Sequence, residues 1–293
     1  MKIALLGGGG QLGWELQRAL APLGQLAVLG REAGGDLADP PALAAAVTAL
    51  RPSVIVNAAA YTAVDKAESD ATTCRTVNAH APAALAGVAR TLGALLVHYG
   101  TDYVFDGNGD APRAEDAATN PLSIYGRTKL EGEQAIQASG CTHLILRTSW
   151  VYAARGGNFA KTMLRLAAER EQLKVIADQV GAPTGADLLA DISAHMICAT
   201  LARPELGGVY HAVAAGETSW HRHARHVIEF ARARGASLKV APDQVLAIPT
   251  AEYPTPAQRP LNSRLCCDKL RANFKLTLPP WQQGVDRMLT EIL

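Results

Sequence analysis

Apolar and polar positions alternate in blocks along the first part of the chain. Short apolar runs at residues 2–6, 25–29 and 54–59 are separated by longer helix-like stretches at 14–23 and 41–50. This order predicts a β-α-β-α-β unit, in which each helix connects two strands of one sheet. The chain is therefore expected to open with three strands and two helices.

The predicted strands at 54–56, 95–99 and 143–146 are nearly continuous apolar runs, rather than apolar at every second position. Such runs indicate strands that are buried on both faces, as they are in a parallel sheet covered by helices. Because crossovers between parallel strands are right-handed, we expect an α/β fold with a Rossmann-type, doubly wound parallel sheet.

The regular alternation continues to about Trp150 and then gives way to a mixed region that contains many prolines. We therefore predict two parts of unequal size. A Rossmann-type domain is expected over residues 1–150, and a later strand or helix returns to it. A smaller C-terminal lobe, which mainly binds substrate, is expected over residues 151–293.

Composition narrows the class of protein and of partner. With 48% hydrophobic and 19% charged residues, the chain is globular rather than disordered. A net charge of +1 gives no electrostatic signature of nucleic acid or membrane binding, so a small molecule is the expected partner. The apolar start is too short for a signal peptide, and no apolar stretch approaches a membrane span, so a cytoplasmic location is expected. Five cysteines without a C-x-x-C pair indicate reduced thiols.

Three glycines with regular spacing follow the first predicted strand. The spacing is Gly7-x-x-Gly10-x-x-Gly13, and a helix is expected to begin at Trp14. Glycines at this place let the backbone approach a pyrophosphate, which the amino end of the helix attracts. The spacing differs from G-x-G-x-x-G and lacks the lysine of a P-loop. We predict a dinucleotide site, and the alternative is a turn with only a structural role.

The second predicted strand ends without the acid that usually binds the ribose hydroxyls of NAD. Arg31 stands there instead, and its guanidinium is suited to a 2′-phosphate, which favours NADPH and leaves NADH open. The alternative is an ordinary surface arginine. Asp36 is predicted to accept from the adenine amino group or to serve as a loop carboxylate. The small residues at 57–60 allow either close approach of the cofactor or tight packing of helix on sheet.

Of the seven tyrosines, only Tyr125 has a lysine, Lys129, four residues later. With Asn120 as helix cap and Pro121 as first helical residue, both side chains should share one helix face. A nearby ammonium lowers the pKa of a phenol and makes it a usable proton donor. Thr101 follows the strand at 95–99 and offers a hydroxyl at the edge where ligands bind. The combination predicts carbonyl reduction, although such a Tyr/Lys pair alone is also common as a surface contact.

Two other features are given structural roles. His221, His223 and His226 do not converge on one face of a helix, so we predict no metal site there and place them on the polar face of an amphipathic helix after Ser219. Trp150 and Phe159 are candidates to flank a nucleotide base, with core packing as the alternative. Neither feature changes the predicted chemistry.

Longer stretches carry a family resemblance over nearly the whole chain. They are GQLGWEL (10–16), NAAAYTAVDKAE (57–68), TDYVFDG (101–107), RTSWVY (147–152), NFAKTM (158–163), DQVGAPT (178–184) and YPTPAQRP (253–260). Together they resemble the dTDP-4-dehydrorhamnose reductases, which are extended short-chain dehydrogenases/reductases. The resemblance implies reduction of the C-4 ketone of dTDP-4-dehydro-L-rhamnose by NADPH, to give a precursor of cell-surface polysaccharide.

The resemblance also assigns roles to individual residues. Cofactor contacts are implied for Gly10, Gln11, Leu12, Asp36, Leu37, Ala60, Tyr61, Thr62, Tyr99 and Lys129. Substrate contacts are implied for Thr101, Asp102, Tyr125 and Trp150. One departure is Gly100, which stands where the family usually has serine. Catalysis is expected to tolerate it because Thr101 keeps its hydroxyl.

Some members of this family hold magnesium between two subunits with three carboxylates. The matching positions are Glu15, Asp187 and Glu291, and the aspartate is shorter than the usual glutamate. Magnesium and a homodimer are therefore implied, with solvated surface acids as the alternative. Two other functions stay open: a related nucleotide-sugar epimerase or dehydratase, and a non-catalytic regulatory subunit with the same fold.

Overall fold

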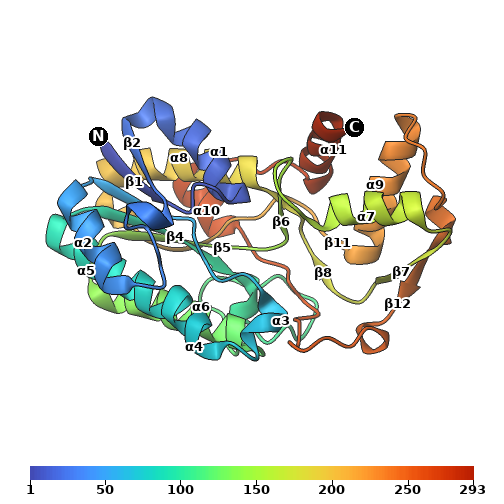
Figure 1. Cartoon of the computed structure of the whole chain (residues 1–293), viewed down its shortest axis with the longest axis horizontal. Coiled ribbons are helices and arrows are strands. Elements are labelled where there is room, and N and C mark those ends of the chain that lie inside the picture. Colours follow the sequence, from blue (N-terminus) through green and yellow to red (C-terminus); the bar gives the residue numbers. More distant parts are fainter.

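A six-stranded parallel sheet forms the centre of the larger part of the computed structural model, which describes residues 1–293 (Figure 1). The strand order is β10-β5-β4-β3-β1-β2, and all five pairings are parallel. The strands are β1 (Lys2–Leu6), β2 (Gln25–Leu29), β3 (Val54–Asn57), β4 (Leu95–Thr101), β5 (His143–Thr148) and β10 (Gly208–His211). This order confirms the predicted doubly wound α/β fold.

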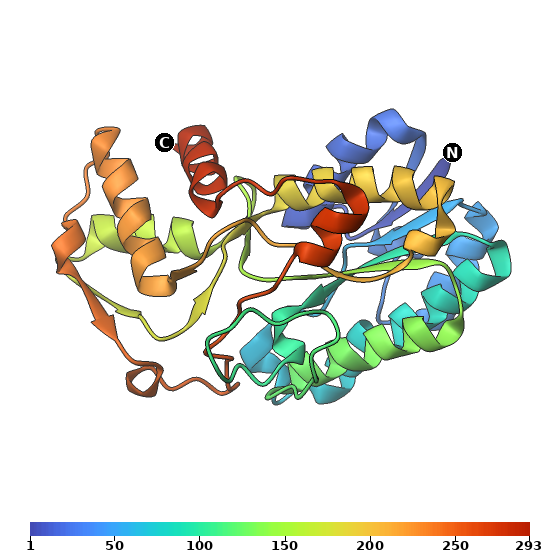
Figure 2. The ribbon, with the colours of Figure 1, turned by 180° about the vertical axis from the view of Figure 1, so that it is seen from behind.

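Helices cover both faces of this sheet (Figures 1 and 2). One face is covered by α1 (Gln11–Leu20), α8 (Ala186–Ala202) and α10 (Asp268–Phe274). The other is covered by α2 (Pro40–Leu50), α5 (Ala81–Leu92) and α6 (Ile124–Ser139). Alternate strand residues enter the two cores: Val54 and Val56 pack under α1 and α8, whereas Ile55 packs under α2 and α5. Burial on both faces explains why the sequences of the inner strands are mainly apolar.

A second core lies beside the sheet, in the part of the chain drawn at the right of Figure 1. It is built from α7 (Phe159–Glu169), α9 (Trp220–Ala233) and α11 (Trp281–Ile292), with β7 (Leu173–Ile176) paired to β12 (Val245–Ile248). Short pairs join the two parts: β6 (Val151–Tyr152) with β9 (Thr184–Gly185), and β8 (Val180–Gly181) with β11 (Thr218–Ser219).

The second half of the chain contributes to both parts. Strand β10 pairs with β5, and helix α8 packs on α1, so both lie against the Rossmann sheet. The limits 1–150 and 151–293 stay a prediction of domain organisation.

Two short helices, α3 (Val64–Ala67) and α4 (Ala71–Arg75), precede a π-helical turn at Thr76–His80. No helix is long and apolar enough to cross a membrane.

Two predicted helix starts are wrong by about a turn. Helix α1 begins at Gln11 rather than Trp14, so Gly13 is inside the helix and not in the turn before it. Helix α6 begins at Ile124, because the Ser123 hydroxyl accepts from the backbone N–H of Gly126 at 3.2 Å. Asn120 and Pro121 lie before this cap, and the Asn120 N–H donates to the carbonyl of Val104. The helix cap is therefore the Ser123 hydroxyl, three residues after the predicted cap Asn120.

Candidate active site

The three predicted catalytic residues come from two elements at the carboxyl edge of the sheet. Thr101 is the last residue of β4, and Tyr125 and Lys129 lie in the first turns of α6. The ring of Tyr103 packs edge-on against Tyr125, with 5.4 Å between centroids. Burial raises the pKa of the Tyr125 phenol, and a hydrogen bond with Thr101 opposes this shift. The resting phenol is therefore protonated, as a proton donor must be.

Lys129 is buried beneath Tyr125 with only 2% of its surface exposed. Its ammonium donates to the carbonyl of Tyr99 at 2.5 Å and lies 3.2 Å from Nε2 of His98. Burial lowers the pKa of Lys129 to about 8, although the Glu133 carboxylate favours the charged form. The side chain thus titrates close to neutrality, unlike an exposed lysine.

A buried ion pair lies below the reacting groups. Glu133, one turn after Lys129, accepts from both Nε and Nη2 of Arg147 at 2.9 and 2.8 Å. In the β4–β5 register, Arg147 stands opposite Gly100, and a Cβ at Gly100 would collide with the Glu133 carboxylate. The glycine at this position is therefore matched to the place that Glu133 occupies.

The predicted substrate residues Asp102 and Trp150 lie next to this group. Asp102 is buried and accepts from the Thr101 hydroxyl at 3.2 Å, and burial raises the pKa of its carboxyl to about 6. Trp150 has a positive φ of 51°, which bulky residues rarely adopt. Its ring stacks on Trp220 at 3.6 Å between centroids. The strained backbone presents the indole to a neighbouring aromatic in the second lobe, so the structure gives Trp150 a defined partner.

The glycine turn forms a closely packed cradle after β1. Gly7 has a φ of 78°, and a Cβ there would meet the backbone of Ala58 and Ala59 at the end of β3. A Cβ at Gly13 would overlap the backbone of Gly7. Gln11 and Leu12 occupy the first turn of α1, whose amino end attracts anions. Only glycine fits at positions 7 and 13, because the backbone segments pack directly against each other there. The tight turn leads into the amino end of α1, where a pyrophosphate is predicted to bind.

Other predicted cofactor residues follow the same edge. Tyr61 is held by the Asn78 amide at its backbone N–H and by Asp70 at its hydroxyl, and these contacts fix the segment that carries Ala60 and Thr62. The hydroxyl of Tyr99 pairs with Ser193 of α8 at 2.7 Å, so this side chain points to the opposite face of the sheet. Only the carbonyl of Tyr99 faces the predicted site, through Lys129.

The residues after β2 are arranged less specifically. Arg31 is exposed in a short 3-10 turn, with its guanidinium available to a ligand. Asp36 accepts from the backbone N–H of Ala38 at 3.0 Å, which is the loop role considered for it. Leu37 is buried in the core under α2. Adenosine binding by these residues stays a prediction.

A cavity of about 880 Å³ lies between the two parts of the chain. Tyr103 and Asp65 line it from the sheet side, and Phe159 and Trp220 line it from the second lobe. Asp65 is paired to Arg259 at 2.7 Å, which ties the sheet side to the C-terminal lobe. The sequence stretches 57–68 and 253–260 contained this pair, but nothing in either stretch showed that the two ends meet.

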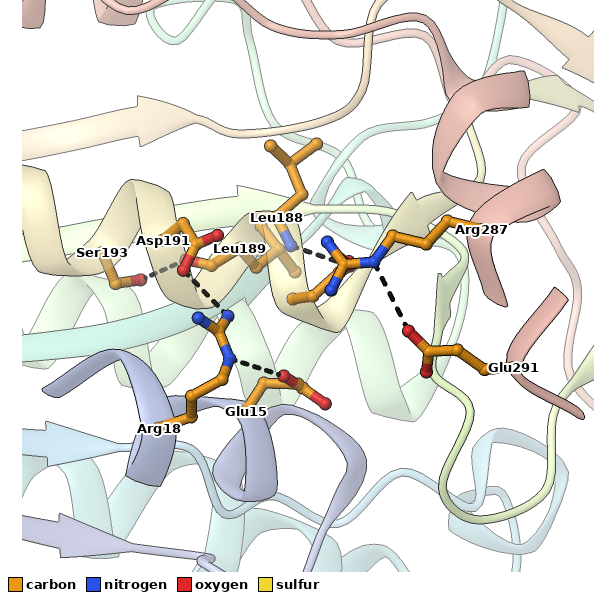
Figure 3. A network of polar contacts seen from close by, with 9 residues as sticks. Glu15, Arg18, Leu188, Leu189, Asp191, Ser193, Arg287 and Glu291 are labelled. Carbon is orange, nitrogen blue, oxygen red and sulfur yellow. Dashed lines mark hydrogen bonds and ion pairs between the residues drawn. The ribbon is translucent and has the colours of Figure 1, made fainter. Parts of the chain in front are cut away.

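The three predicted magnesium ligands lie near one another in the structure. Glu15, Asp187 and Glu291 line one small cavity. Figure 3 shows Arg18 beside Glu15 and Asp191, and Arg287 beside Glu291. Arg18 pairs with Glu15 at 3.3 Å, and Arg287 lies 3.5 Å from Asp187 and 3.4 Å from Glu291. No group of three histidine, cysteine or acidic residues is arranged to hold a metal ion. The predicted site lies between two subunits, so magnesium binding by these three carboxylates stays a prediction.

The histidines of α9 differ in part from expectation. His223 is buried against Trp281 and Phe159, rather than on the polar face. His226 does lie toward the surface and pairs with Asp286 of α11 at 2.6 Å. The helix packs between α7 and α11, so its buried face is wider than a one-sided pattern suggests. The five cysteines are all free, as predicted.

Comparisons with known proteins agree with this geometry. The family model described as RmlD substrate binding domain matches residues 1–293. The dTDP-4-dehydrorhamnose reductases of Shigella flexneri and Escherichia coli K12 are 56% and 55% identical to the chain, and each alignment covers 100% of this chain and 98% of the relative. The crystal structure of the Bacillus anthracis dTDP-4-dehydrorhamnose reductase in complex with NADP has a TM-score of 0.90 at 34% identity, with 99% of each chain covered. The chain therefore belongs to the dTDP-4-dehydrorhamnose reductase family.

Proposed function

We propose that this chain reduces the C-4 ketone of dTDP-4-dehydro-L-rhamnose to dTDP-L-rhamnose with NADPH. The observation that carries the proposal is the placement of Thr101, Tyr125 and Lys129 at one edge of the sheet, beside the glycine cradle of β1 and α1. Relatives with this name, at up to 56% identity over the whole chain, support the same activity.

The chain's own groups serve the proton side of this reaction. NADPH, when bound, supplies the hydride that reduces the ketone carbon. Tyr125 donates its phenolic proton to the developing alkoxide, and Thr101 stabilises the negative oxygen by donating its one hydroxyl hydrogen to it in place of Asp102. Lys129 stabilises the phenolate by its charge. The buried setting strengthens each of these interactions, because the local dielectric constant is low.

The cavity between the two parts suits the nucleotide half of the substrate. Its aromatic residues Phe159 and Trp220 offer faces for a base, and Arg170 and Lys174 bring positive charge for a diphosphate. The lobe after residue 150 contributes all four of these side chains. We therefore assign substrate binding mainly to that lobe.

The activity is tested with purified protein, NADPH and a set of nucleotide sugars. We expect NADPH consumption with dTDP-4-dehydro-L-rhamnose and none with dTDP-glucose, which has no ketone to reduce. Cofactor that stays bound without net consumption, together with a rearranged sugar, would favour an epimerase. Failure to bind any dTDP-sugar would favour a regulatory subunit.

Arg31→Ala tests the choice of cofactor. If the Arg31 guanidinium pairs with the 2′-phosphate, its loss should lower the ratio of kcat/KM for NADPH to that for NADH by about 10- to 100-fold, as for a hydrogen bond to a charged group. The measurement is steady-state kinetics with both cofactors. Arg203→Ala, which removes another exposed arginine at the far end of α8, is the matched control. An unchanged ratio in Arg31→Ala would reject the assignment.

The pH dependence should report the protonation of Lys129. Its pKa is lowered to about 8 by burial, so the ammonium that stabilises the phenolate is present below that pH and is lost above it. We expect kcat/KM to fall as pH rises through about 8, because the free enzyme then loses the charged form. Tyr125 is not the group responsible, since burial raises its pKa well above this range. A profile that stays level to about pH 10 would contradict this role.

A further inference from the structure

Asn57 and His98 form a buried pair that the reaction described above does not use. They are register partners on the neighbouring strands β3 and β4, and each is only 1% exposed. Nδ2 of Asn57 lies 3.1 Å from Nδ1 of His98. On its other side, Nε2 of His98 lies 3.2 Å from Nζ of Lys129. The pair therefore connects the end of one strand with a predicted catalytic residue.

The contacts of Asn57 determine where His98 carries its hydrogen. The backbone N–H of Ala59 donates to Oδ1 of Asn57 at 3.2 Å, so the amide nitrogen is the atom that faces His98. An amide nitrogen only donates, and Nδ1 of His98 must therefore accept. Burial and the nearby Lys129 hold the pKa of His98 well below its usual value, so the ring is neutral. A neutral ring that accepts at Nδ1 has its hydrogen on Nε2.

This tautomer turns a donor toward Lys129. An ammonium group has three donors and no acceptor, so a charged Lys129 meets the Nε2–H of His98 as donor against donor. A neutral amine has a free lone pair and accepts the Nε2–H as a hydrogen bond. The other partner of Nζ, the carbonyl of Tyr99, accepts from either form. The contact with His98 thus favours the neutral form of Lys129.

The remaining charged and titratable groups around Lys129 act in other ways. Glu133, one turn later on α6, favours the ammonium, and so does Cys74 of α4. Arg147 of β5 lies behind Glu133 and pairs with it. Tyr125, one turn earlier, bears a proton in the resting state. Nζ of Lys129 has two polar contacts, with the Tyr99 carbonyl and with Nε2 of His98, and only the contact with His98 opposes the ammonium form.

We propose that Asn57 and His98 are positioning residues that make Lys129 release its proton more readily than burial alone would. This inference rests on the proposed catalytic role of Lys129. The proton of Lys129 is then readily available to the Tyr125 phenolate that is formed in each turnover. Neither residue touches the reacting atoms in this scheme, because each acts through Lys129.

The proton affinity of Lys129 is measured by an NMR titration of the full chain with isotope-labelled lysine, in which Lys129→Met assigns the signal. We expect His98→Gln to raise the titration midpoint by about one pH unit or more, because the new amide turns its oxygen toward the ammonium. Asn57→Leu should raise it as well, since His98 is then free to move its hydrogen to Nδ1. His223→Gln replaces a buried histidine of the other core and should leave the midpoint unchanged.

A structural role alone would lower stability in these variants without moving the midpoint, and an unchanged midpoint in folded His98→Gln and Asn57→Leu overturns the proposal. If neither variant folds, the wild-type protein decides, because labelled-histidine NMR reports the tautomer directly. A hydrogen on Nδ1 of His98 rejects the proposal, and one on Nε2 supports it. Neither measurement needs substrate, so a missing reductase activity would reject the proposed function and leave this inference to be judged separately.

Discussion

Tyr125→Phe is expected to lower kcat by about 10²- to 10⁴-fold, which is the usual contribution of a positioned general acid. The substitution removes only the phenolic oxygen, so the developing alkoxide loses its proton donor while the ring keeps its edge-on contact with Tyr103. NADPH affinity should change little, because the glycine cradle and Lys129 stay in place. The two effects are separated by single-turnover kinetics and by equilibrium titration with NADPH.

The matched control is Tyr210→Phe. Tyr210 is also buried, and its hydroxyl bonds to the Leu206 carbonyl and the Asn273 amide, far from the strand end that carries Thr101. This variant should lose some stability but keep its kcat. A near-normal kcat in Tyr125→Phe would show that another group, with Asp102 as the nearest buried acid, donates the proton.

The sequence predicted the sheet and the edge that carries the site, because both depend on local patterns. Continuous apolar runs identified β3, β4 and β5 as strands buried on two faces, and the runs at 2–6 and 25–29 are β1 and β2, of which β2 is the half-exposed edge strand. The glycine spacing predicted the cradle, in which Gly7 and Gly13 have no room for a side chain. Tyr125 and Lys129 could be assigned to one helix face from their spacing alone. The order of strands and helices along the chain then predicted that both lie at the same edge of the sheet as Thr101.

The sequence could not show the contacts that depend on strand register and on packing across the sheet. His98 lies beside Asn57 only because β3 and β4 pair in a particular register, and Arg147 meets Gly100 for the same reason in β4 and β5. Forty residues of chain separate the first pair, and no spacing rule connects them. Tyr99 illustrates the same limit. His98, the residue before it on β4, faces Lys129, whereas the hydroxyl of Tyr99 faces α8.

The carboxylates Glu15, Asp187 and Glu291 show a different limit. The sequence resemblance correctly brought three distant positions to one small cavity. It did not predict that Arg18 and Arg287 pair with them there, or that Arg18 also pairs with Asp191, because side-chain pairing depends on the local packing of α1, α8 and α11 (Figure 3). Magnesium, a homodimer and a cytoplasmic location stay predictions.

Glu133→Leu is expected to destabilise the protein by about 3–5 kcal/mol, the usual result of leaving one partner of a buried ion pair alone. Glu133 and Arg147 are 0% and 5% exposed at the side chain, so water cannot replace the lost carboxylate. The free energy of unfolding is measured by urea denaturation followed by circular dichroism. Glu169→Leu, in an exposed pair with Arg165 in which the side chains are 54% and 62% exposed, should cost about 1 kcal/mol or less.

The double variant Glu133→Leu with Arg147→Met separates loss of the pair from loss of shape. If the cost comes from the uncompensated guanidinium, replacing both partners by apolar residues should recover most of the stability, since an apolar pair of similar volume replaces a buried ion pair at little cost. Its activity should nevertheless stay low. The carboxylate that favours the Lys129 ammonium is gone. The contact with His98, which favours the neutral amine, is then no longer opposed by a carboxylate of α6. Recovery of stability together with full activity would show that Glu133 supports the fold alone and has no part in setting the charge of Lys129.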